Sequence, residues 1–182
     1  MTEKSFFKET ANNKILDFVR TLGFSKIAEN AYRKQYGDYG ITIEYDGRFP
    51  EKTKIDYGNR ILCHSKTVSL CFQPETFVVL ECVNRLLEKG YKPENIELGM
   101  LQGKKSWDIL VKEGQEDNAV AIECLAWPLA FHKKHKEKSV QRYQKTEELC
   151  FYTSQISDGK IEFFTNTRLF EDDKKILIPA GK

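Results

Sequence analysis

The chain has 182 residues, of which 40% are hydrophobic and 31% are charged, a composition typical of a folded globular protein and not of a disordered one. The formal net charge of +2 excludes a uniformly polycationic molecule, so a surface for nucleic acid would have to come from local clusters of basic residues. Five cysteines without a CxxC pair, no signal-peptide core and no apolar run near ~18 residues lead us to expect a cytoplasmic protein with no membrane contact.

The N-terminal third combines helical and strand-like patterns. Apolar side chains recur at helical spacing over residues 4–20, and Gly23 is a plausible stop for that helix. A second short helix is predicted over residues 25–36. Residues 39–47 and 52–58 then alternate apolar and polar side chains on either side of a turn-rich link, which predicts a β-hairpin.

The clearest helix in the sequence is predicted over residues 74–91. Pro74 suits a first helical turn, Glu75 suits the positive end of the helix dipole, and Gly90 suits the exit. Apolar side chains recur along one face, so this helix is expected to pack against a core.

The rest of the chain alternates strands with one further helix. The predicted elements are strands at 96–100 and within 106–127 (two strands joined by a polar turn), a polar helix over 131–147, and strands at 149–154 and 160–167. The order helix, strand, strand, strand, helix, strand predicts an α/β unit around a mixed central sheet. We expect this unit, residues 61–182, to pack with an α+β extension, residues 1–60, as a single globular body.

Two carboxylates stand in the otherwise apolar pair of strands. If the turn is centred between Gln115 and Glu116, Asp108 faces Glu123 directly, with Cβ atoms about 4.5–5.5 Å apart. Carboxylate oxygens bind hard divalent cations at about 2.0–2.6 Å, so this pair could hold one Mg²⁺ or Mn²⁺. The alternative is that this end of the hairpin lies in water at a sheet edge, where the pair would have no function.

The surroundings of the two carboxylates are predicted to be apolar on both faces of the hairpin. Because side chains alternate along a strand, the face with the carboxylates also carries Leu110, Ala121 and Leu125, and the opposite face carries Ile109, Val111, Val120 and Ile122. Such a hairpin is expected to be an inner one, covered on both sides. A metal ion, a cationic partner or a bound proton would then have to offset the repulsion between the carboxylates.

Four stretches occur in an order and at spacings that resemble a known family. They are "FVVLECVNRLLEKGYKPENIEL" (77–98), "DILVK" (108–112), "AIEC" (121–124) and "LCFYTSQISDGKI" (149–161). They resemble the N-terminal nuclease domain of type I restriction enzymes, in the form fused to N6-adenine DNA methylases, over about residues 56–165. That family belongs to the PD-(D/E)xK nuclease superfamily, whose core is a mixed sheet of about four strands between two helices.

The resemblance implies a metal-dependent DNA nuclease site. It places the catalytic aspartate at Asp108 and the catalytic glutamate at Glu123, both as ligands of Mg²⁺ or Mn²⁺, with Glu81 as a third acidic residue on the helix. It implies phosphodiester hydrolysis of double-stranded DNA within a restriction-modification system, with methylase or specificity subunits as partners. The metal in such a site polarises the scissile phosphate and lowers the pKa of the attacking water.

The sequence departs from the family at two positions beside this site. Leu125 stands where the family has the lysine of Glu-x-Lys, and "QGKKSWD", with the bulky Trp107, replaces a glycine-rich loop before Asp108. The departures imply a degenerate nuclease domain unless another lysine substitutes, the candidates being Lys104, Lys105, Lys133 and Lys134. Two hypotheses stay open, a nuclease and a catalytically inactive module for DNA binding or subunit docking.

One dense basic stretch lies in the predicted second helix. Lys134, Lys138, Arg142 and Lys145 would line one face and contact the DNA backbone, a sequence-independent and salt-sensitive interaction. The alternative is a solvated helix without a ligand. His132 and His135 share a face as well, but two histidines without a third ligand are weak evidence for zinc.

Overall fold

The structure is a computed structural model, in which part of the chain is described. The described residues are 16–45, 52–65, 74–102, 105–112, 119–125, 147–157, 160–165, 168–170 and 177–179. For some strand residues, Leu125 among them, only the backbone is described.

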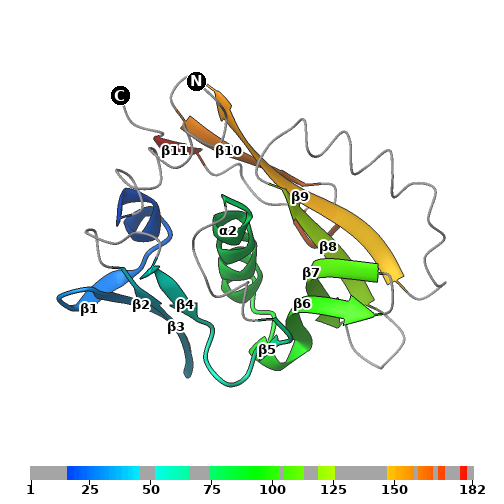
Figure 1. Ribbon diagram of the computed structural model, residues 1–182, viewed down its shortest axis with the longest axis horizontal. Coiled ribbons are helices and arrows are strands. Elements are labelled where there is room, and N and C mark those ends of the chain that lie inside the picture. The colour runs from blue at the N-terminus through cyan, green and yellow to red at the C-terminus, as the bar shows by residue number, and fades with distance from the viewer. Residues whose placement is uncertain are drawn as a thin grey trace.

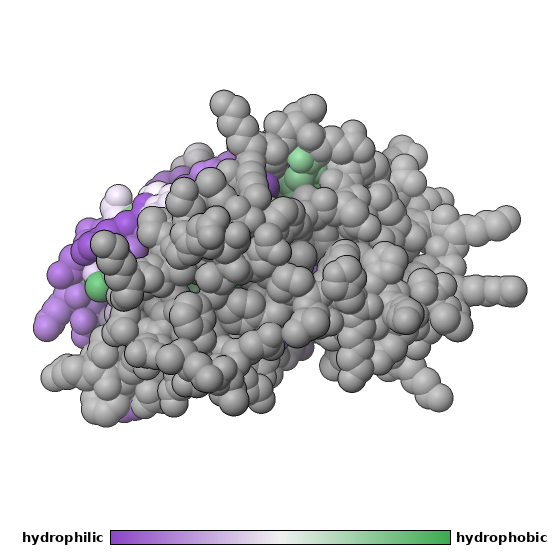
Figure 2. Space-filling model, turned by 90° about the horizontal axis from the view of Figure 1, so that it is seen from above, coloured by the Kyte–Doolittle hydropathy of each residue, from purple (hydrophilic) through white to green (hydrophobic). Residues whose placement is uncertain are grey.

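The N-terminal part forms a four-stranded antiparallel sheet with the order β1-β2-β3-β4 (Figure 1). Its strands are β1 (Ser25–Ala28), β2 (Ala31–Tyr36), β3 (Tyr39–Glu44) and β4 (Lys54–Asp56). Residues 16–21 before it are helical, and the helix ends at Gly23 as predicted, with φ of 86°. The outer side of this sheet presents a largely hydrophilic surface (Figure 2).

The helix predicted over residues 25–36 is wrong, because this segment forms the β1–β2 hairpin. The side chains of Tyr32, Lys34 and Tyr36 alternate along β2 and point toward the interior, while Arg33 and Gln35 are exposed. Burial of this alternating face outweighs the local helical pattern. The hairpin predicted from residues 39–47 and 52–58 is confirmed by the antiparallel pairing of β3 with β4.

The second sheet has seven strands in the order β11-β10-β9-β8-β7-β6-β5. Its strands are β5 (Leu62–Cys63), β6 (Ile96–Gln102), β7 (Lys105–Lys112), β8 (Ala119–Leu125), β9 (Glu147–Ser157), β10 (Lys160–Thr165) and β11 (Leu177–Pro179). The pairs β5–β6 and β8–β9 are parallel and the other pairs are antiparallel. The sheet is therefore mixed, as predicted, and β5 and β11 are strands that the sequence pattern did not reveal.

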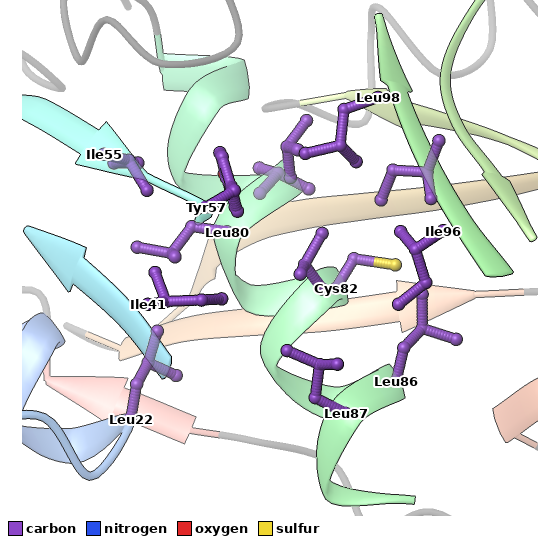
Figure 3. Close-up of a cluster of buried hydrophobic side chains, with 14 of the residues drawn as sticks. Leu22, Ile41, Ile55, Tyr57, Leu80, Cys82, Leu86, Leu87, Ile96 and Leu98 are labelled. Atoms are coloured by element: carbon purple, nitrogen blue, oxygen red, sulfur yellow. The ribbon is translucent and has the colours of Figure 1, made fainter. Parts of the chain in front are cut away.

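Helix α2 (Pro74–Glu88) lies between the two sheets (Figure 1). Every residue from 76 to 87 is buried, because strands cover the helix on both sides. In Figure 3, Ile41 and Ile55 of the N-terminal sheet approach one side of α2, and Ile96 and Leu98 of β6 approach the other. The predicted helix is thus confirmed, with its exit at Gly90, whose φ of 88° is a backbone conformation that favours glycine.

The molecule combines α and β elements around one hydrophobic cluster. The cluster runs from Phe18 in the first helix to Phe170 in the short turn η4 (Arg168–Phe170), and another short turn, η3 (Pro93–Asn95), links α2 to β6. Both halves of the chain contribute to the same core. Within the described ranges, no helix has the length and apolar character needed to cross a membrane.

Candidate active site

The site is built where β7 and β8 separate. Their antiparallel pairing runs from Lys112 and Ala119 to Ile109 and Ile122, in the register predicted from the sequence, and the next residues in that register are Asp108 and Glu123. The pairing ends there, although β7 stays paired with β6, and β8 with β9. We call this place, with Asp108, Glu123 and Cys124, the β7–β8 fork.

Asp108 spans the gap between the separating strands. Its Oδ2 accepts a hydrogen bond of 2.7 Å from the backbone N–H of Cys124 on β8. A hydrogen bond to an ionised acceptor is short and strong, so this contact orients the carboxylate at the opening of the fork. The side chain itself is half-buried, which leaves it partly accessible.

Glu123 is buried, with 3% of the residue exposed. Its strand β8 lies between β7 and β9 in the interior of the sheet. The alternative that this end of the hairpin lies in water at a sheet edge is therefore wrong. Both faces are covered as predicted: one contributes to the main core, and on the other Trp107, Leu110 and Ala121 form a second buried cluster.

Glu81 on α2 is completely buried and forms an ion pair within the helix. Its Oε1 accepts hydrogen bonds from Arg85, at 2.7 Å from Nη2 and 3.2 Å from Nε. The Arg85 guanidinium also lies 5.4 Å from the centre of the Phe170 ring. Sequence reasoning missed Arg85, although its spacing of four residues from Glu81 is the signal for such a pair.

Two buried thiols connect α2 to the fork. Cys82 of α2 and Cys124 of β8 are hydrogen-bonded to each other, and burial raises the pKa of both thiols. The negative charges of Glu81 and Asp108 raise the pKa of each thiol further. Glu81 on the helix and Asp108 at the fork therefore both lie close enough to the two buried thiols to influence their pKa.

The donor atoms at the fork suit a hard divalent cation. Among the residues that the structure describes, no three or more His, Cys, Asp or Glu side chains converge as a metal-binding group. Mg²⁺ in phosphoryl-transfer sites is typically bound by one or two carboxylates, with waters and substrate phosphates completing its shell. Asp108 and Glu123 supply carboxylate oxygens, which are the donor type that such a site uses.

Several of the predicted site residues have side chains outside the described part of the structure. The backbone of Leu125 pairs with Thr153 of β9, but its side chain is not described. The same holds for the side chain of Lys105. The other candidate lysines and the predicted DNA-binding face, namely Lys104, Lys133, Lys134, Lys138, Arg142 and Lys145, lie outside the described residues.

No model of a known protein family matches the sequence, and a search of curated proteins finds no significant match. The resemblance to type I restriction nuclease domains consequently rests on the four stretches quoted above.

Proposed function

We propose that this chain is a PD-(D/E)xK nuclease-like domain of a DNA restriction-modification system. Asp108 and Glu123 would hold Mg²⁺ or Mn²⁺ against a phosphate of double-stranded DNA. The observation that carries the proposal is the β7–β8 fork, where two acidic residues stand at the point of separation of two central strands. Of the two carboxylates, that of Asp108 is half-buried, so it is the one that a metal bound to a phosphate would reach first.

The order of the elements supports the same proposal. Helix α2 precedes three antiparallel strands, β6, β7 and β8, and β9 returns parallel to β8. A parallel neighbour requires a crossover connection, which here must be residues 126–146. The helix and the mixed strands among the described residues agree with the first part of the restriction-endonuclease-like core that the resemblance implies, and its second helix would lie outside the described residues.

The chemistry follows from what each residue can do. A bound metal would polarise the phosphate and lower the pKa of the attacking water. Asp108 is oriented by the backbone N–H of Cys124, and Glu123 is shielded from bulk water, which strengthens electrostatic interactions at the site. Arg85 neutralises Glu81, which favours a supporting role for that glutamate in the charge balance of the site.

A second candidate function is a catalytically inactive module that binds DNA or docks a methylase or specificity subunit. Leu125 favours it, because leucine at the lysine position can neither donate a hydrogen bond to water nor carry charge. Metal or DNA binding could persist without cleavage.

Replacing Asp108 tests the site. In Asp108→Asn, the amide oxygen can still accept from Cys124, so we expect the free energy of unfolding to change by less than about 1 kcal/mol. Loss of one of two carboxylate ligands should weaken Mn²⁺ binding at least about tenfold in calorimetry. Glu44→Gln, at an exposed position of β3, is the matched control and should leave Mn²⁺ affinity unchanged.

Plasmid nicking then separates the two candidates. Mn²⁺-dependent nicking that is abolished in Asp108→Asn supports the nuclease. Mn²⁺ or DNA binding by the unmodified protein without nicking supports the inactive module. If the unmodified protein binds no Mn²⁺ at millimolar concentration, the proposed metal site is wrong.

A further inference from the structure

Among the described residues, five glycines have a positive φ, and one of them differs from the rest in its place. Gly23 and Gly90 follow the ends of helices, Gly37 lies in the turn between β2 and β3, and Gly58 lies in the turn after β4. Gly99, with φ of 64°, lies inside β6 instead. Extended strands have φ near −120° to −140°. A turn or a helix end explains the other four glycines, but Gly99 needs another explanation.

The pairing of β6 with β7 is irregular at this residue. Leu98 pairs with Ile109, and pairing resumes at Met100. The register skips the intervening pair, which joins Gly99 to Asp108. Because the register is the same before and after the skipped pair, no residue is inserted and the irregularity is not a β-bulge. Gly99 therefore lies opposite the aspartate of the β7–β8 fork.

The irregularity at Gly99 is not fraying of a strand end. Just before it, β5 pairs with β6 up to Leu98. Glu97 is buried and contacts a side chain on each side of β6: its Oε2 lies 2.8 Å from Nε2 of His64, and its Oε1 contacts Nζ of Lys112 on β7. Pairing with β7 also continues after Gly99. The left-handed conformation is thus a local feature inside a strand that is held on both sides of it.

Regular pairing changes at Asp108 on both sides of β7. The pairing with β8 ends at the preceding register position, Ile109, and the pairing with β6 skips the position of Gly99. The Asp108 carboxylate reaches across to β8, where its Oδ2 accepts the hydrogen bond of 2.7 Å from the backbone N–H of Cys124. The left-handed glycine and the oriented carboxylate therefore lie at the same level of the sheet.

We propose that Gly99 is a positioning residue of the β7–β8 fork, whose left-handed conformation interrupts the β6–β7 ladder so that the Asp108 carboxylate can reach Cys124 and a metal ion. The inference rests on the proposed function, because it assigns Gly99 a role in the same metal site. In most L-residues, contact between Cβ and the following carbonyl oxygen disfavours the left-handed conformation. Such a residue at position 99 would favour extended backbone and regular pairing opposite Asp108, which would shift the carboxylate.

Gly99→Ala tests this role against a control with the same backbone cost. Gly37 has φ of 65°, and a Cβ added there would meet nothing within 4 Å, so Gly37→Ala carries the same conformational penalty in the β2–β3 turn. Both variants should raise the unfolding equilibrium constant about five- to thirtyfold in urea denaturation. Gly99→Ala should also weaken Mn²⁺ binding about ten- to a hundredfold in calorimetry, whereas Gly37→Ala should leave it unchanged.

Gly99→Asn is the conservative variant. Asparagine adopts the left-handed conformation more readily than alanine, so this variant should bind Mn²⁺ within about threefold of the unmodified protein. It keeps the role testable if Gly99→Ala does not fold. Unchanged affinity in Gly99→Ala would overturn the positioning role. So would an equal loss of affinity in Gly37→Ala, or a loss of about tenfold in Gly99→Asn.

Amide exchange measured by NMR separates this inference from the proposed function. The N–H of Cys124 donates to Asp108 itself, so its protection reports the position of that carboxylate. In Gly99→Ala, this protection should fall about tenfold more than that of the Ile122 amide, and in Gly37→Ala both should fall alike. That result in a protein that binds no Mn²⁺ would support the positioning of Asp108 and show that the proposed metal site is wrong. If the unmodified protein binds Mn²⁺ but neither measurement changes in Gly99→Ala, the positioning role alone is wrong.

Discussion

The two sides of helix α2 are equally buried, but their polar groups are arranged for different purposes. Toward the N-terminal sheet, Asn84 Oδ1 accepts hydrogen bonds from Lys34 Nζ at 2.6 Å and from the Tyr36 hydroxyl at 2.7 Å. Lys34 also donates to the carbonyl of Leu22 and contacts Glu88. This network ties the first helix, β2 and α2 together, and its charges compensate one another.

Toward β8 and η4, the polar groups of α2 lie near the end of the β7–β8 pairing. Glu81 is neutralised within the helix by Arg85, and Cys82 contacts Cys124 beside the fork. The comparison teaches that burial of a charge does not by itself mark a functional site. The polar groups toward the N-terminal sheet join elements and stabilise the fold, whereas under the proposed function the carboxylates at the end of the β7–β8 pairing would meet a metal ion.

The largest effect should come from breaking the charge balance on the fork side. Arg85→Met leaves the buried carboxylate of Glu81 without its guanidinium partner, and we expect a loss of about 3–5 kcal/mol of unfolding free energy. Urea denaturation measures it. The double variant Glu81→Gln/Arg85→Met removes both charges and should recover most of the loss. If Arg85→Met were as stable as the unmodified protein, Glu81 would not be a buried charge that depends on Arg85.

A smaller effect is expected on the opposite side of α2. Lys34→Met removes the donor shared by Leu22 and Asn84, but Asn84 keeps its bond from Tyr36, so the loss should be about 1–3 kcal/mol in urea denaturation. The exposed end of the network provides a control, since Glu88→Gln should cost less than about 1 kcal/mol. If Lys34→Met instead weakened Mn²⁺ binding at unchanged stability, the separation of the two sides would be wrong.

The smallest effect is expected in how groups on the two sides of α2 change the stability of the protein at alkaline pH. The pKa of the Cys82 thiol is raised in the folded protein, so its contribution to stability is complete below the usual thiol pKa and is lost as the pH rises above about 8.5. The pKa of the Tyr36 hydroxyl is raised too, mainly by burial, so its contribution is lost only above about pH 10.

Between pH 8.5 and 10, the free energy of unfolding measured by urea denaturation should therefore depend on the buried thiols and not on the Tyr36 hydroxyl. The free energy of unfolding of the unmodified protein should fall as the pH rises. In Cys82→Ala this fall should be shallower, by up to about 1.4 kcal/mol per pH unit. Tyr36→Phe should leave the slope in this range unchanged. Equal slopes in the unmodified protein and Cys82→Ala would contradict the raised thiol pKa.

Much of the fold could be predicted because its signals are local. The apolar face and termini of α2, the β3–β4 hairpin and the register of β7 with β8 all follow from side-chain periodicity and turn residues. The failure at residues 25–36 has a physical cause, since the alternation of Tyr32, Lys34 and Tyr36 has meaning only once α2 covers that face. Local propensity cannot anticipate such tertiary burial.

The candidate site was predictable in part for the same reason. The opposition of Asp108 and Glu123 follows from the two-residue period of strands. The separation of β7 from β8, and the bond from Cys124 to Asp108, depend on how each strand pairs with its other neighbour, which no local pattern contains. The contacts of Glu97 with His64 and Lys112 likewise join residues that are distant in the sequence.

The position of α2 between two sheets has a consequence for the folding pathway. Strands from both halves of the chain cover this helix, so neither sheet can bury its apolar face before α2 docks. The parallel pairs β5–β6 and β8–β9 also require closure of long segments before their hydrogen bonds form, and such non-local pairing slows folding. The chain should therefore fold slowly and as one cooperative unit, with docking of α2 as the step that commits both sheets.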